Sequence, residues 1–149
     1  MPIRTLSEIS SKRSLYSIDP DATLVEASEL MASQNVGALA VCDDGHLVGI
    51  LSERDVIRRV VVKGLIPENT LVRNVMTTPP VTMPGHAAPA EALGEMKRGG
   101  FRHLIVTERG VATGMVSMRD IPTENRLMWE RYEDYTAMRP LDDTVQPYA

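Results

Sequence analysis

The feature that most constrains this chain is a seven-residue stretch that occurs twice. Residues 49–55 read Gly-Ile-Leu-Ser-Glu-Arg-Asp, and residues 114–120, which lie 65 positions later, read Gly-Met-Val-Ser-Met-Arg-Asp. The same spacing pairs Ala22 with Ala87 and Leu39 with Leu104 without a gap. The chain is therefore predicted to be a tandem duplication.

Each copy places a serine, an arginine and an aspartate at the start of a predicted helix. Unpaired N–H groups and the positive end of the helix dipole favour an anion such as phosphate at that point. The alternative is plain N-capping, because Ser-x-x-Asp is close to a capping box. Capping does not require the arginine. The residues concerned are Ser52, Arg54, Asp55, Ser117, Arg119 and Asp120.

Length and composition predict an ordinary soluble protein. The 149 residues suffice for one domain or for two half-domains that share a core. The net charge of −4 does not favour a broad interaction with nucleic acid. The single cysteine, Cys42, excludes an intramolecular disulfide and is expected to be an inert packing residue. We find no signal sequence or membrane-spanning run, so a cytoplasmic location is the default expectation.

Hydrophobic periodicity and turn residues predict two copies of a strand–helix–strand–strand–helix unit. Thr5 and Thr23 are predicted helix caps, and Ser52 and Ser117 open the helices that follow the hairpins. Expected helices cover residues 6–10, 24–34, 53–63, 72–76 and 89–98, and expected strands cover residues 16–18, 38–42, 47–51, 81–83, 103–107 and 111–116.

The second copy departs from the first at two positions. Ala88 stands where the first copy has its Thr23 cap, so that helix should begin more loosely. Pro122 should bend the final helix or make it restart near Thr123. A C-terminal helix with Leu127, Met128, Trp129, Tyr132 and Tyr135 on one side is expected to pack at a subunit contact, and residues 139–149 are expected to be weakly ordered or docked on a partner.

These features resemble the CBS domain pair, or Bateman module, named after cystathionine β-synthase. The resemblance covers about residues 5–135 and rests on Asn-Val-Gly-Ala-Leu at 35–39, Arg-His-Leu at 102–104 and Ser-x-Arg-Asp in both copies. It implies an α/β (α+β) fold of two pseudo-symmetric β-α-β-β-α repeats packed sheet to sheet. The expected division is 1–64 with an N-terminal helix, a linker over 65–78, a second repeat over 79–135 and a tail over 136–149.

The resemblance also implies two clefts that each hold an adenosine-containing molecule. Asp55 and Asp120 would accept the ribose hydroxyls, Ser52 and Ser117 would meet phosphate, and Arg54 and Arg119 would neutralise it. Adenine would lie near the first strand of a copy. Arg102 and His103 would reach phosphate or ribose, whereas the first copy has Gly37 and Ala38 at the equivalent positions. The two clefts are therefore expected to differ in affinity. The adenine stretches include Tyr16, Ser17, Ile18, Thr78 and Val81. Which segment completes which cleft is left open.

The expected function is a stand-alone, non-catalytic regulatory module that binds AMP, ADP or ATP, with NAD(H) or S-adenosylmethionine as alternatives. It would need no obligatory cofactor or metal, would form a homodimer, and would be read by an unidentified protein partner. The alternative from another class is a structural dimerisation scaffold with vestigial clefts. A hydrolase using Ser117, His103 and Asp120 has the residue types of a triad but lacks the Gly-x-Ser-x-Gly elbow.

Overall fold

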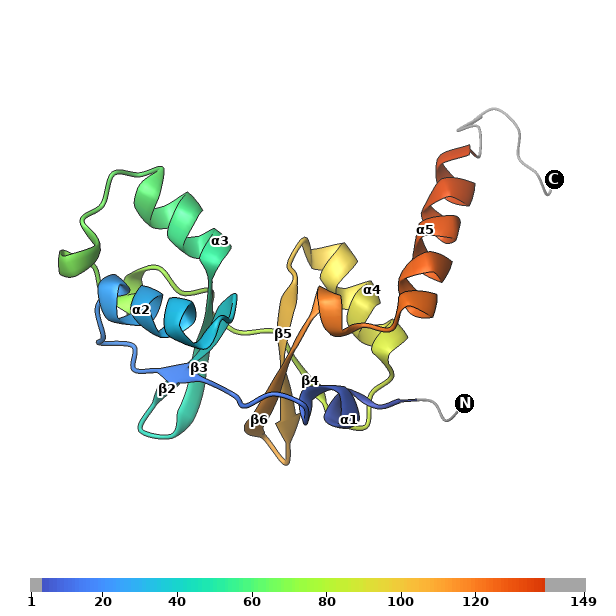
Figure 1. Ribbon diagram of the computed structural model, residues 1–149, viewed down its shortest axis with the longest axis horizontal. Helices are drawn as coiled ribbons and strands as arrows, with labels where there is room; N and C mark the ends of the chain where they lie inside the picture. Colours follow the sequence, from blue (N-terminus) through green and yellow to red (C-terminus); the bar gives the residue numbers. More distant parts are fainter. Residues whose placement is uncertain (1–3, 139–149) are drawn as a thin grey trace.

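The computed structural model describes residues 4–138 as two halves that lie side by side, each with one three-stranded sheet (Figure 1). Within each sheet the first strand runs parallel to the second, and the second and third form an antiparallel hairpin. The first half contains β1 (Ser17–Ile18), α2 (Leu24–Gln34), β2 (Ala38–Asp43), β3 (His46–Ser52) and α3 (Glu53–Val56), and the second contains β4 (Thr82–Pro84), α4 (Pro89–Gly99), β5 (His103–Glu108) and β6 (Val111–Ser117). The predicted fold class is confirmed.

The two hairpins repeat each other residue for residue. Ala38 faces Ser52 across the first hairpin, and His103 faces Ser117 across the second. Both ladders shift register after the same position, between Val41 and Cys42 and between Val106 and Thr107. The turns take positive φ at two successive residues, which a tight two-residue hairpin turn requires: Asp44, Gly45, Arg109 and Gly110. The predicted duplication therefore extends to the irregularities of the strands.

Helix starts follow the predicted caps. Thr5 begins α1 (Leu6–Ser10), and the Thr23 hydroxyl accepts from the Glu26 N–H at 3.2 Å at the start of α2. Ala88 takes the N-cap position of α4 without a side-chain bond, as predicted. The helix that α3 begins continues as a π-helical turn over Ile57–Val61, which the sequence did not indicate.

Pro122 divides the last helical segment, as predicted. A 3-10 turn, η4 (Met118–Asp120), follows Ser117, and α5 (Thr123–Met138) then starts anew. Proline has no N–H to donate and crowds the preceding turn, and it therefore kinks or breaks a helix at that position. Trp129 packs against the core of the second half, whereas most apolar side chains of α5 are exposed: Leu127, Met128, Tyr132 and Tyr135. The expectation for residues 139–149 lies outside the described residues.

The segment before each first strand packs on the opposite half. In α1, Leu6 and Ile9 are buried among residues of the second half, and the Leu6 N–H donates to the Ala87 carbonyl at 3.0 Å. In η3 (Val72–Asn74), Val72 is buried in the first half, and its N–H donates to the Ala22 carbonyl at 2.9 Å. Packing thus crosses the domain boundaries expected from the sequence, because residues assigned to the first repeat pack on the second half. The division into domains stays a prediction.

The chain therefore passes from one half to the other twice. Residues 11–16 lead from α1 to β1, and residues 76–81 lead from the end of the linker to β4 (Figure 1). We call these two stretches the first and second crossing segments. Apolar residues of both sheets meet between the halves, including Ala40, Ile50 and Ile105, so the sheets pack face to face as predicted.

Cys42 belongs to this contact between the sheets. It is a free thiol on β2, is partly buried, and packs against the cluster formed by Ala38, Ala40, Ile50 and Ile105. Burial raises the pKa of the Cys42 thiol, which keeps it in its less reactive protonated form. The structure thus supports the predicted packing role.

Candidate functional site

Two cavities lie between the halves, and each is bordered by one crossing segment. The first cavity has a volume of about 970 Å³, and the second about 310 Å³. The first crossing segment lines the first cavity through Arg13 and Tyr16, and the second lines the second cavity through Thr77 and Val81. The two cavities are therefore related by the same duplication as the strands.

Each cavity combines a crossing segment with the Ser-x-Arg-Asp motif of the opposite copy. Ser117, Arg119 and Asp120 line the first cavity, together with the loop that contains Gly37 and Ala38. The second cavity takes its motif from the first copy and its loop from the second copy. Its lining includes Ser52, Arg54, Asp55, Gly100, Phe101, Arg102 and His103. The structure thus answers which segment faces which motif, a question the sequence left open.

In both copies the motif forms a capping box. The Ser52 N–H donates to Asp55 Oδ2 at 2.9 Å, and the Ser52 hydroxyl donates to the same oxygen at 3.1 Å. Ser117 makes the same two bonds to Asp120 Oδ2, at 2.8 and 3.1 Å. The capping alternative is therefore observed, and it commits one carboxylate oxygen of each aspartate. The other oxygen, Oδ1, takes no part in the cap.

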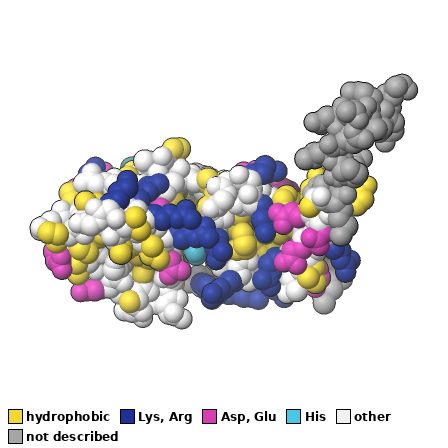
Figure 2. Space-filling view, turned by 90° about the horizontal axis from the view of Figure 1, so that it is seen from above, with side chains coloured by type: hydrophobic (Ala, Val, Ile, Leu, Met, Phe, Trp, Pro, Cys, Tyr) yellow, Lys and Arg dark blue, Asp and Glu magenta, His cyan; other side chains and the backbone are white. Residues whose placement is uncertain are grey.

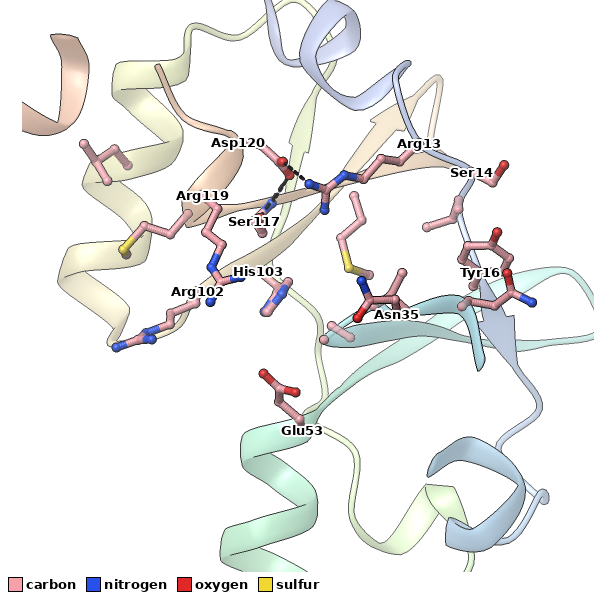
Figure 3. Close-up of a pocket in the computed structure, with 18 of the residues that line it drawn as sticks. Arg13, Ser14, Tyr16, Asn35, Glu53, Arg102, His103, Ser117, Arg119 and Asp120 are labelled. Atoms are coloured by element: carbon pink, nitrogen blue, oxygen red, sulfur yellow. Dashed lines mark hydrogen bonds and ion pairs between the residues drawn. The ribbon is translucent and has the colours of Figure 1, made fainter. Parts of the chain in front are cut away.

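The Oδ1 atoms of the two aspartates have different partners. Asp120 Oδ1 forms an ion pair with Nη2 of Arg13 at 3.1 Å, which Figure 3 shows as a dashed line. Asp55 Oδ1 accepts a hydrogen bond from the Thr77 hydroxyl at 3.3 Å and lies 3.9 Å from Nε of Arg59. Sequence reasoning missed Arg13, because its polar loop carries no motif.

Three side chains form a wall shared by the two cavities: Glu53, Arg102 and His103 line both. A Cβ at Gly37 would lie 3.2 Å from His103 Nε2 and 3.3 Å from Glu53 Oε1, so glycine admits this close approach. Burial lowers the pKa of His103 and outweighs the opposing effect of the nearby Glu53 carboxylate. The imidazole is thus held toward its neutral form. The sequence did not single out Glu53.

Basic residues predominate along both cavities. The first is lined by Arg13, Lys97, Arg102, Arg119 and Arg126, and by the acidic residues Glu53, Asp120 and Glu130. In the second, Arg54, Arg58, Arg59 and Arg102 face Glu53 and Asp55. Figure 2 shows Lys and Arg side chains gathered between the two halves, with a histidine among them. A local positive potential of this kind favours an anionic ligand, although the chain as a whole is negative.

Three predicted adenine-site residues line neither cavity. Ser17 and Ile18 pair with Ala40 and Val41 in the first sheet. The Thr78 hydroxyl donates to the Val48 carbonyl at 2.9 Å. Ser17 and Ile18 thus belong to β1, after the crossing segment that borders the cavity has ended, whereas the Thr78 side chain is turned to the β3 backbone. Tyr16 and Val81, predicted in the same stretches, do line cavities.

The described residues offer neither a metal site nor a membrane span. Within residues 4–138, no group of three or more His, Cys, Asp or Glu side chains is arranged to hold a metal ion. Over the same range, no helix has the length and apolar character that crossing a bilayer demands.

Comparison with known families gives the repeat a name. The family model described as CBS domain matches residues 6–62 and again residues 72–122. The chain belongs to the CBS domain family. Its two matches correspond to the two copies of the duplication, so the protein contains a CBS domain pair.

Relatives agree with this assignment. The CBS domain-containing protein CBSCBSPB2 of Arabidopsis thaliana is 34% identical over 116 residues, which are 77% of this chain and 22% of that protein. The CBS pair thus spans about a fifth of the length of that relative. A putative signal-transduction protein with CBS domains from Burkholderia ambifaria has a TM-score of 0.75 at 28% identity, covering 78% of this chain and 90% of the other.

One similar structure was determined with a nucleotide. The CBS domain protein PAE2072 from Pyrobaculum aerophilum, complexed with AMP, has a TM-score of 0.75 at 26% identity. The match covers 87% of this CBS pair and 98% of that chain.

Proposed function

We propose that this CBS pair is a non-catalytic regulatory module that binds adenine nucleotides in the cavities between its halves. The observation that carries the proposal is that the two carboxylate oxygens of each motif aspartate have different roles. In Asp55 and Asp120, Oδ2 closes a helix cap, while Oδ1 contacts side chains that line the cavities, Thr77 at Asp55 and Arg13 at Asp120, whose place a ribose can take. A carboxylate oxygen can accept from both hydroxyls of a ribose, which a vicinal diol presents close together. Capping thus orients the ligand-binding atom.

The surroundings of each Oδ1 support a phosphorylated ligand. Arg119 and Arg102 border the first cavity, and Arg54 and Arg102 border the second. Apolar side chains of the first cavity, among them Val36 and Met115, offer surfaces for an adenine ring. Its volume lies within the usual range for ligand pockets. AMP in the similar PAE2072 structure supports the same ligand class.

Within this class, AMP, ADP or ATP is the proposed ligand, and NAD(H) or S-adenosylmethionine shares the adenosine group that the site would recognise. The Ser hydroxyls, predicted to meet phosphate, donate to the aspartates in this structure. A phosphate role for Ser52 or Ser117 would therefore require that hydroxyl to turn. The arginines need no such change, and we assign the main phosphate contacts to them.

A hydrolase remains the less favoured function. A triad serine donates its hydroxyl proton to a histidine. Here the Ser117 hydroxyl donates to Asp120 at 3.1 Å. We therefore propose that the protein transmits ligand binding as a change between its halves to an unidentified protein partner, without chemistry of its own.

We also propose that the module forms a homodimer through its helices. Exposed apolar side chains follow α3 and its π-helical extension, where Ile57, Val61 and Val62 are 55%, 67% and 73% exposed. A second set lies on α5 and includes Met128, Tyr132 and Tyr135. Burying both sets against a second copy would remove this surface from water. Light scattering that gives a single monomer mass would contradict this proposal.

The binding proposal is tested by calorimetry with AMP, ATP and NADH on the wild type and on Asp55→Asn plus Asp120→Asn. Asparagine retains a carbonyl oxygen for the cap, but its second polar atom donates and cannot accept from a ribose. We expect the double variant to keep its melting temperature and to lose binding. Asp43→Asn, an exposed carboxylate outside both cavities, is the matched control.

Two results would decide against this function. No heat and no thermal shift with any of these compounds at millimolar concentration would remove the adenine-nucleotide proposal. Binding that is unchanged in the double variant would favour the alternative, a dimerisation scaffold whose clefts are vestigial. Mass spectrometry of compounds that co-purify with the protein identifies the ligand independently.

A further inference from the structure

Arg13 lies outside both Ser-x-Arg-Asp motifs but contacts the aspartate of the second one. It lies on the first crossing segment, between α1 on the second half and β1 on the first (Figure 1). Its guanidinium reaches over the first cavity to Asp120 Oδ1, at 3.1 Å (Figure 3). The Arg13 side chain is 60% exposed, whereas that of Asp120 is 15% exposed. The ion pair therefore joins a movable surface cation to a fixed, capped carboxylate.

We propose that Arg13 makes the first cavity selective for anionic adenosine compounds over neutral ones. This inference rests on the proposed function, because it takes Asp120 Oδ1 as the ribose acceptor. In the structure, Arg13 occupies the atom that the ribose would use. A ligand that binds there must displace the guanidinium, and what becomes of the displaced charge decides which ligands bind well.

A neutral and an anionic ligand differ in the contacts that they offer to the guanidinium of Arg13 after they displace it from Asp120. Adenosine replaces the ion pair with hydroxyl contacts to Asp120 and leaves Arg13 to water. AMP makes the same contacts and also brings a phosphate, with which the displaced guanidinium can form paired hydrogen bonds. Because Arg13 is exposed, its side chain is free to turn without repacking a core. Arg102 and Arg119 line the same cavity and add to the phosphate environment.

The second cavity lacks this arrangement and serves as an internal comparison. The position that corresponds to Arg13 in the repeat is Thr78, whose hydroxyl donates to the Val48 carbonyl. Asp55 Oδ1 instead accepts from the neutral Thr77 hydroxyl. The nearby Arg59 is held by bonds from Nη1 to the carbonyls of Val75 and Met76, at 2.8 and 3.0 Å. A ligand in the second cavity therefore displaces no mobile cation.

The test is an NMR titration of the full chain with AMP and with adenosine. The Ser117 amide reports on the first cavity and the Ser52 amide on the second, so each cavity gives its own Kd. The variants are Arg13→Gln, which removes the charge, and Arg13→Lys, which keeps it. Lys12→Gln is the matched control, because Lys12 is an exposed cation on the same segment that lines neither cavity.

We expect Arg13→Gln to weaken the AMP affinity of the first cavity, measured at the Ser117 amide, by about tenfold. This is the size of one charge-assisted hydrogen bond. The adenosine affinity measured at the Ser117 amide should be unchanged or higher. The affinities of the second cavity for both ligands, measured at the Ser52 amide, should not change. Arg13→Lys should retain most of the AMP affinity, and Lys12→Gln should match the wild type.

Three results would overturn the inference while leaving the proposed function in place. These are an equal loss of AMP and adenosine in Arg13→Gln, an unchanged AMP affinity in that variant, and AMP binding by the wild type at Ser52 alone. A wild type that binds no adenine compound at either amide would instead overturn the proposed function, and this inference with it.

Discussion

The imidazole of His103 lies against Gly37, at a distance where a single added methyl group would meet His103 Nε2 at 3.2 Å. The same methyl group would meet Glu53 Oε1 at 3.3 Å. Both side chains border the first and the second cavity. This contact between a loop of the first half and a strand of the second therefore shapes both candidate sites.

Gly37→Ala is expected to weaken nucleotide binding at both cavities several-fold, because His103 and Glu53 must move away from the new methyl group. Separate affinities at the Ser52 and Ser117 amides measure the effect. Gly94→Ala is the control: its Cβ would meet Arg98 at an ordinary 3.6 Å within α4. It should leave binding intact and stabilise the helix by about 0.5–1 kcal/mol. Unchanged binding in Gly37→Ala would contradict the shared wall.

The free energy of unfolding should fall as the pH drops below about 6.5, the ordinary pKa of histidine. Burial lowers the pKa of His103 in the folded protein, so the unfolded chain takes up the proton first. The stabilisation is complete above the unfolded pKa and is lost as the pH falls through the folded one. Urea unfolding at a series of pH values measures it.

His103→Gln should flatten this pH dependence relative to the wild type. His86→Gln, which changes an exposed histidine outside both cavities, is the matched control. Equal slopes in the wild type and His103→Gln would refute the assignment to His103.

Leu6→Ala should destabilise the protein by about 2–5 kcal/mol, although Leu6 belongs to a five-residue helix near the chain start. Leu6 is fully buried against the second half, so its removal leaves a cavity there. Val111→Ala, at a position 61% exposed on the second hairpin, is the control and should cost less than about 0.5 kcal/mol. Chemical denaturation compares the two, and equal small effects would disprove the docking of α1.

Ala88→Thr should stabilise the protein by about 0.5–2 kcal/mol, because it supplies the hydroxyl that the N-cap of α4 lacks. The Ala88 backbone, at φ −82° and ψ 147°, nearly matches that of Thr23, at φ −80° and ψ 162°. Ala88→Val has the shape of threonine without the hydroxyl. Thermal unfolding in which the valine variant gains as much as the threonine variant would exclude capping as the cause.

Local features of the fold were predictable because local chemistry determines them. The turns at Gly45 and Gly110, the Thr23 cap and the restart after Pro122 each follow from one or two residues. The repeat spacing then carried the strands and hairpin turns of one copy to the other. The π-helical turn after α3 has no comparable local signal, since its residues suit an ordinary helix equally well.

Features that join distant parts of the chain were less accessible. The motif residues were found because they recur, and the structure places them at cavities. Arg13 and Glu53 were missed because each gains its position from the packing of one half on the other. Ser17, Ile18 and Thr78 line neither cavity, because the first two lie within β1 and the Thr78 hydroxyl is bonded to Val48, and the sequence shows neither feature.

Because α1 packs on the second half and η3 packs on the first, each half is covered by a segment that precedes the first strand of the other. Any rotation of the second half carries α1 with it, since Leu6 is buried there. The same rotation pulls on the stretch that holds Arg13 and ends in the opposite sheet. A hinge movement at one cavity therefore reaches α1 directly, without passing through the linker.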